Sequence, residues 1–114
     1  MIDHDYLKSL HDEVGSSVIL LLISEVSEIV ASHRDEFLAC VNGVSNADLG
    51  ALAHLRRGQA AMLGCTDYAR ALSQLEALAS DARVPREVVV GYIEDTTAIA
   101  MATVAALAAY TQAA

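Results

Sequence analysis

The chain has 114 residues, enough for one ordinary domain, and its formal net charge of −8 argues against nucleic acid, whose phosphates require a basic protein face. Hydrophobic residues make up 54% of the chain and aromatic residues only 4%, so alanine and leucine supply most of the apolar content. One proline and six glycines are too few turn formers for a many-stranded β fold. The composition predicts a single helical domain spanning residues 1–114.

The cysteines and the apolar stretches bear on the compartment. Cys40 and Cys65 form no CxxC pair and no secretory signal opens the chain, so we expect the cytoplasm. Residues 18–23 are apolar but too few to cross a bilayer. Residues 96–114 carry no charge, but they are mostly alanine and threonine, which favours a packed helix over a membrane span. We therefore expect no membrane partner.

The first two predicted helices meet at a glycine. A short helix is expected over residues 2–14 and ends at Gly15, after which Ser16 or Ser17 can cap a long second helix. Asn42 and Gly43 end that helix. Its apolar stripe has helical spacing and includes one histidine, which we expect to be interior and hydrogen-bonded. The stripe comprises Ile19, Leu22, Ile23, Val26, Ile29, Val30, His33, Phe37 and Val41.

Three more helices are predicted. Ser45 or Asn46 opens the third, with Ser45 and Asp48 resembling a capping box, and Gly64 ends it. Thr66 is expected to cap the fourth. A loop over residues 81–84 precedes the last helix, which has Pro85 in its first turn. The predicted core positions of the last two helices are Leu72, Leu75, Leu78, Val88, Tyr92, Thr96, Ile99, Thr103, Leu107 and Tyr110.

This order of elements predicts a fold. Four substantial helices with one-sided apolar stripes are typical of a helical bundle, and their connections are too short to join parallel neighbours. We predict an all-α fold: an antiparallel up-down four-helix bundle with a short additional N-terminal helix.

The third helix carries a histidine in unusual surroundings. At about 100° per residue, His54, Arg57, Gly58 and Ala61 lie on one side of this helix, roughly opposite Leu49, Leu52 and Leu63. Because a bundle buries leucines, His54 should face water beside one cation and bare backbone. A mid-helix glycine costs roughly 1 kcal/mol relative to alanine. Gly58 is therefore explained if another molecule must approach the imidazole.

The pattern resembles the histidine phosphotransfer (HPt) domain family of two-component phosphorelays. The family signature is roughly H-x-x-K-G-x-[SA]-x-x-[LIF]-G on the third helix. The chain also has the break at Gly15, the long second helix and a Leu75–Glu76 pair on the fourth helix. It departs from the family at Arg56, which replaces an apolar residue, and at Gln59, which replaces a small one. The matching segment reads His54-Leu-Arg-Arg57-Gly58-Gln-Ala60-Ala-Met-Leu63-Gly64.

The resemblance implies a role for each matching residue. His54 accepts a phosphoryl group from a phospho-aspartate of a receiver domain and passes it to another receiver; a neutral imidazole, with an unperturbed pKa of about 6.5, is a suitable nucleophile. Arg57 offsets charge on the transferring oxygens. Gly58 leaves room for the receiver. Glu76 and Gln59 support the histidine, with Glu76 accepting the proton of one ring nitrogen.

The expected partners also follow from the resemblance. They are the receiver domains of a hybrid histidine kinase and of a response regulator, which dock on Leu55, Ala61, Met62 and the outer side of the Phe37 region. Mg²⁺ belongs to the receiver, so this chain is expected to need no cofactor or metal. The family is often monomeric, so the resemblance implies a monomer. The chain has no nucleotide-binding loop, so we expect a phosphocarrier rather than an enzyme with kinase activity.

The two departures from the signature leave an alternative open. The chain could be a non-phosphorylated adaptor that binds a histidine kinase or response regulator through the same face. In either case an unpaired buried guanidinium would be costly, so we expect Arg56 to reach solvent or to pair with an acid such as Asp95 or Glu25. A di-iron bundle enzyme is disfavoured, because the sequence lacks paired Glu-x-x-His motifs.

Overall fold

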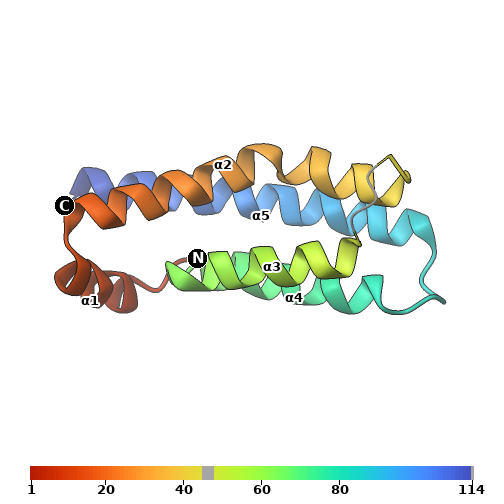
Figure 1. Ribbon diagram of the computed structural model, residues 1–114, viewed down its shortest axis with the longest axis horizontal. Helices are drawn as coiled ribbons and strands as arrows, with labels where there is room; N and C mark the ends of the chain where they lie inside the picture. Colours follow the sequence, from red (N-terminus) through yellow and green to blue (C-terminus); the bar gives the residue numbers. More distant parts are fainter. Residues whose placement is uncertain (45–47, 114) are drawn as a thin grey trace.

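The computed structural model describes residues 1–44 and 48–113. All regular structure in these residues is helical and forms five helices (Figure 1). The predicted start of the third helix at Ser45 or Asn46 lies outside the described residues. The all-α prediction is confirmed for the described part of the chain. The helices are α1 (His4–Val14), α2 (Ser16–Val41), α3 (Leu49–Met62), α4 (Thr66–Ala79) and α5 (Arg86–Ala113).

The four longer helices lie lengthwise beside one another, and consecutive ones run in opposite directions (Figure 1). α3 packs mainly on α4 and α2 mainly on α5, with further contacts between α4 and α5 and between α2 and α3. α1 packs against α2 at one end. The molecule measures 45 × 22 × 20 Å. α3 therefore has an outer face that no other helix covers.

A glycine in a left-handed conformation ends α3 as predicted. Gly64 has a φ of +69°, and the N–H groups of Gly64 and Cys65 donate to the carbonyls of Ala61 and Ala60 at 3.0 and 3.1 Å. These two bonds form a Schellman motif. The Gly64 carbonyl also accepts from the Asp3 N–H at 2.8 Å, which joins the start of α1 to the end of α3.

Several predicted helix starts differ from the structure. α1 begins at His4 and not at residue 2, and Gly15, not Ser16 or Ser17, is the N-cap of α2. Asp48 is the N-cap of α3, and its Oδ1 accepts from the Gly50 N–H at 3.0 Å. Cys65, not Thr66, is the N-cap of α4, and the Thr66 hydroxyl donates to the Met1 carbonyl instead. Pro85 directly precedes α5, one residue earlier than predicted. Each difference is a shift of a few residues at most, which is common at helix ends.

The core follows the predicted stripes with one exception. The large buried apolar side chains come from α1, α2, α4, α5 and the turn after α3, while α3 itself buries only Ala53 and Ala60. Val88 was predicted to be a core residue but is 50% exposed, and its neighbour Val89 packs against the core in its place. The core includes Leu7, Ile19, Val26, Phe37, Leu63, Tyr68, Leu72, Leu75, Ile93 and Leu107.

By length and mean hydropathy alone, Ser16–Val41 and Arg86–Gln112 could each cross a membrane. The apolar run at residues 18–23 thus belongs to a longer apolar helix than the run itself suggests. Core helices of soluble proteins have the same length and composition, and both helices here supply core side chains.

His33 is the interior histidine that the sequence predicts. Its Nδ1 and Nε2 lie 2.8 Å from the Tyr68 hydroxyl and the Thr96 hydroxyl, so it joins α2, α4 and α5. The Thr96 hydroxyl donates to the Ile93 carbonyl, so it accepts the proton of His33 Nε2, and Tyr68 donates to Nδ1. Burial lowers the pKa of His33 to about 4. The ring is therefore neutral and fully hydrogen-bonded near pH 7.

Folding stability should decrease as the pH falls from about 6.5 to about 4, because the unfolded chain binds a proton at His33 in this range and the folded protein does not. A pKa difference of this size corresponds to about 3 kcal/mol. Urea unfolding at several pH values measures this loss of unfolding free energy. A His33→Gln variant should be less stable at pH 7 but lose less stability over this range; an equal loss in both proteins would contradict the assignment.

The His54 surface

His54 lies on the outer face of α3, and its side chain is 62% exposed. Gly58 follows one turn later, and a Cβ atom added there would meet nothing within 4 Å. Ala61 is also exposed. The predicted orientation of this face is confirmed, so the approach to the imidazole from the Gly58 side is open.

Two charged side chains meet at Nδ1 of His54. The Glu76 carboxylate from α4 lies 3.1 Å (Oε2) and 3.3 Å (Oε1) from Nδ1. The Arg57 guanidinium lies 2.9 Å from the same atom through Nη2, and 3.8 Å from Glu76 Oε1 through Nη1. Among the described residues, Nε2 of His54 has no hydrogen-bond partner. The contacts that orient the ring therefore all converge on one of its two nitrogens.

Ser73 belongs to the site although the sequence analysis did not single it out. Its hydroxyl oxygen accepts a hydrogen bond of 3.3 Å from Arg57 Nη1. Ser73 precedes Glu76 by three residues on α4, so the two side chains share the face that turns toward α3. The register of α4 against α3 places them beside Arg57, and a single helix does not reveal that register.

An open depression of about 440 Å³ adjoins the histidine between the start of α3 and the end of α4. It provides space beside the ring for a small group or for a side chain of a partner. Its lining consists of Asp48, Gly50, Ala51, His54, Glu76, Ala79 and Ser80.

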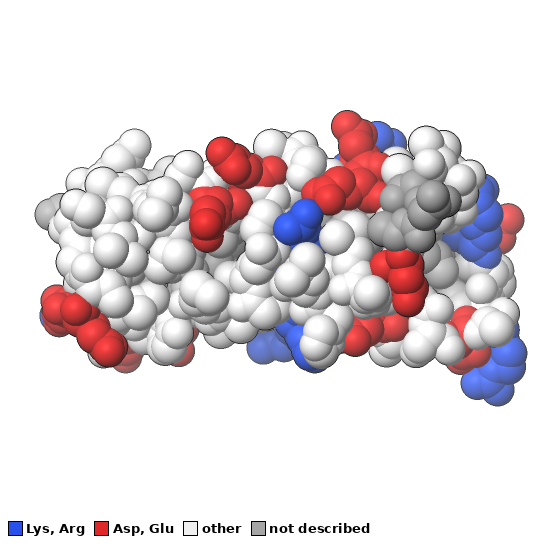
Figure 2. All heavy atoms as spheres, in the orientation of Figure 1, with Lys and Arg blue, Asp and Glu red and all other residues white. Residues whose placement is uncertain are grey.

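Most of the predicted docking residues are accessible. Leu55 and Met62 are 55% and 53% exposed, and Ala61 is exposed beside them. The Phe37 side chain is buried, so it contributes to the core and not to a docking surface. Acidic side chains predominate among the charged groups on the face shown in Figure 2, and the surface over the first half of α2 is largely uncharged.

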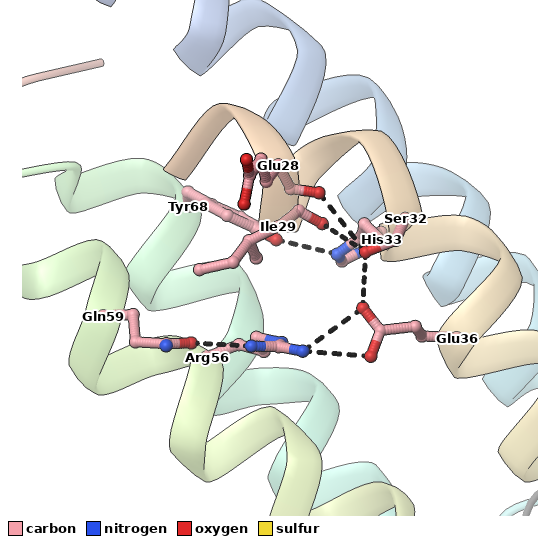
Figure 3. A network of polar contacts seen from close by, with 8 residues as sticks. All are labelled: Glu28, Ile29, Ser32, His33, Glu36, Arg56, Gln59 and Tyr68. Carbon is pink, nitrogen blue, oxygen red and sulfur yellow. Dashed lines mark hydrogen bonds and ion pairs between the residues drawn. The ribbon is translucent and has the colours of Figure 1, made fainter. Parts of the chain in front are cut away.

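Arg56 and Gln59 face α2 instead of the imidazole (Figure 3). Arg56 donates through Nη2 to Glu36 Oε2 at 2.9 Å and through Nη1 to Gln59 Oε1 at 2.9 Å. The predicted partners of Arg56, Asp95 and Glu25, were wrong, because Glu36 lies opposite Arg56 across the seam between α2 and α3. The prediction that Gln59 supports His54 was also wrong, since its hydrogen bond goes to Arg56.

The Glu36 carboxylate is held by two donors. Burial opposes its ionisation, but hydrogen bonds from Ser32 at 2.6 Å and from Arg56, together with the Arg56 charge, keep the pKa of Glu36 below its ordinary value. Glu36 is thus charged near pH 7 and compensates the guanidinium. The ion pair explains how the seam between α2 and α3 accommodates this arginine.

Removing one partner of this pair should destabilise the protein more than removing both. Glu36→Leu leaves a guanidinium that is only 18% exposed without its counter-ion, and we expect a loss of about 1–2 kcal/mol of unfolding free energy. The double variant Glu36→Leu/Arg56→Leu should recover most of that loss. Urea unfolding of both single variants and the double variant measures the coupling, and additive losses would contradict the interpretation.

Among residues 1–44 and 48–113, no group of three or more His, Cys, Asp or Glu side chains is arranged to hold a metal ion. Comparison of the chain with protein-family models, with characterised proteins and with solved structures gives no match. The geometry around His54 and the sequence motif are therefore the basis for a functional assignment.

Proposed function

We propose that this protein is an HPt-type phosphocarrier that accepts a phosphoryl group on His54 from the phospho-aspartate of a receiver domain and passes it to another receiver. The four longer helices form the antiparallel up-down four-helix bundle of that family, and α1 is the additional N-terminal helix. One observation carries the proposal: an exposed imidazole has Nδ1 against Glu76 and Arg57, with open space over Gly58.

Nε2 is the atom proposed to accept the phosphoryl group. Its lone pair attacks phosphorus, the P–N bond forms as the P–O bond to the receiver aspartate breaks, and the aspartate leaves as a carboxylate with the bonding electrons. The ring keeps its Nδ1 proton and gains positive charge. The Glu76 carboxylate, 3.1 Å from Nδ1, accepts this proton in a hydrogen bond and stabilises the charge.

Arg57 and Gly58 assist in different ways. The Arg57 side chain is 38% exposed, so its guanidinium is free to turn toward the oxygens of an incoming phosphoryl group and to offset their charge. Gly58 allows the partner to bring its aspartate close to the ring. The Mg²⁺ that phosphoryl transfer requires belongs to the receiver in this family, so the proposal assigns no cofactor to this chain.

The proposed partners are the receiver domains of a hybrid histidine kinase and of a response regulator, which dock on Leu55, Ala61 and Met62 around His54. The protein acts as a cytoplasmic monomer with no autokinase activity. The adaptor alternative is based on Arg56 and Gln59, the two departures from the family signature. Because Arg56 bonds Glu36 of α2, Gln59 bonds Arg56, and both leave His54 open, they favour a histidine that is still used.

Incubation with receivers phosphorylated on aspartate tests the proposal. We expect the label to move to this protein and to be lost in acid but retained in base, as for phosphohistidine. A stable complex without transferred label would favour the adaptor, and a label that survives acid would contradict a phosphohistidine.

A further inference from the structure

Nδ1 of His54 lies between a group that can only donate and a group that can only accept. The Arg57 guanidinium, 2.9 Å away, always donates, and the ionised Glu76 carboxylate, 3.1 Å away, always accepts. A single ring nitrogen cannot satisfy both. A protonated Nδ1 donates to Glu76 and repels the Arg57 N–H. An unprotonated Nδ1 accepts from Arg57 and faces the lone pairs of Glu76.

The outcome of this competition decides whether Nε2 can react. In a neutral imidazole, one nitrogen carries the proton and the other carries the free lone pair. When Nδ1 holds the proton, the lone pair is on Nε2, which is then a nucleophile. When Nδ1 accepts from Arg57, Nε2 holds the proton and cannot attack phosphorus.

We propose that Arg57 is a switch on the tautomer of His54: at rest it holds the ring in the unreactive form against Glu76, and an incoming phosphoryl group releases the ring by attracting Arg57 away. The tautomer switch follows from the contacts alone, while its role in transfer rests on the proposed function. Ser73 is a positioning residue, because its hydroxyl accepts from Arg57 Nη1 at 3.3 Å and holds the guanidinium against Nδ1.

Release is favourable because of charge. A phosphoryl group offers Arg57 anionic oxygens in a bidentate arrangement. Its resting hydrogen-bond partners, Nδ1 and Ser73, are neutral, and its anionic neighbour Glu76 Oε1 lies 3.8 Å from Nη1, beyond hydrogen-bond distance. As Arg57 leaves, Nδ1 takes a proton from water, keeps it and hydrogen-bonds it to Glu76, and Nε2 gives its own proton to water. The ring gains no net proton, and the nucleophilic lone pair appears when the donor is present.

Nitrogen NMR of the ¹⁵N-labelled protein, at a pH where the His54 ring is neutral, reads the tautomer directly. Arg57→Met removes the donor, and we expect the ratio of the Nδ1–H to the Nε2–H form to rise by about fivefold to tenfold, as for loss of a hydrogen bond to a charged group. Arg57→Lys should restore much of the Nε2–H form. Glu76→Gln should shift the ratio in the opposite direction from Arg57→Met.

Ser73→Ala tests the positioning residue, and Ser80→Ala is its matched control. Ser80 directly follows α4 and lines the depression beside His54, but its hydroxyl donates to the Ala77 carbonyl and not to the site. Ser73→Ala should move the tautomer ratio in the same direction as Arg57→Met, and Ser80→Ala should leave it unchanged. Adding inorganic phosphate should raise the Nδ1–H fraction in the wild type but not in Arg57→Met.

An unchanged ratio in Arg57→Met, or an Nδ1 that is fully protonated in the wild type, would overturn the switch. This readout needs no phosphoryl transfer, so it is separable from the proposed function. If the tautomer ratio responds to Arg57 but the protein never accepts label, the phosphocarrier proposal is wrong and the tautomer switch is supported. If His54 accepts label but the tautomer ratio does not respond to Arg57, the phosphocarrier proposal is supported and the tautomer switch is wrong.

Discussion

Replacing His54 by glutamine is expected to abolish phosphoryl acceptance from a phosphorylated receiver. Glutamine keeps a hydrogen-bonding side chain of similar reach, but its amide nitrogen has no nucleophilic lone pair near pH 7. Because the His54 side chain is 62% exposed and makes no core contact, the fold should persist. Radiolabel transfer measures the loss, and circular dichroism checks the fold.

His4→Gln is the matched control for this experiment. His4 is also exposed, but it lies on α1 in the part of the molecule where α1 packs on α2. This variant should accept label as the wild type does. Label that persists in His54→Gln and disappears in His4→Gln would show that the phosphorylated histidine is on α1 and would contradict the proposal.

Replacing Gly58 by glutamine should reduce transfer by about 100-fold without destabilising the protein. A displacement of reacting groups by about 1 Å has an effect of that order, and a side chain at this position lies where a receiver must approach. Glutamine is also a better helix former than glycine, so we expect a gain of about 0.5 kcal/mol in unfolding free energy. Single-turnover transfer kinetics and urea unfolding measure the two effects.

Gly91→Gln provides the control for helix propensity. Gly91 lies in α5, is exposed, and has nothing within 4 Å of an added Cβ, as at Gly58. α5 packs on α2 and α4, so this glycine is remote from the outer face of α3. Gly91→Gln should gain similar stability and transfer at the wild-type rate. Equal transfer rates in both variants would mean that the Gly58 surface is not approached.

Much of the fold follows from local signals in the sequence. Gly15 and Gly64 end their helices because both adopt positive φ, and the loop over residues 81–84 was predicted from the residues around it. The stripe of α2 predicted the burial of His33. Val88 shows where a periodic pattern fails, since helical periodicity continues to the end of a helix even where no neighbour covers it.

The candidate site was predictable only where one helix forms it. The exposure of His54 and the open space at Gly58 follow from positions on α3 alone, and Glu76 was named through the family resemblance. The contacts of Arg57 with Ser73 and of Arg56 with Glu36 depend on how α4 and α2 are aligned with α3. Such contacts between helices require the three-dimensional packing, since many registers of three helices satisfy the same apolar stripes.

Phosphorus–proton correlation NMR of the protein after transfer from a phosphorylated receiver tests the central claim most directly, because it identifies the atom that carries phosphorus. We predict phosphorus bonded to Nε2 of His54, with correlations to both carbon-bound ring protons of that residue. Phosphorus on Nδ1, on another histidine, or on an oxygen of any side chain would contradict the account.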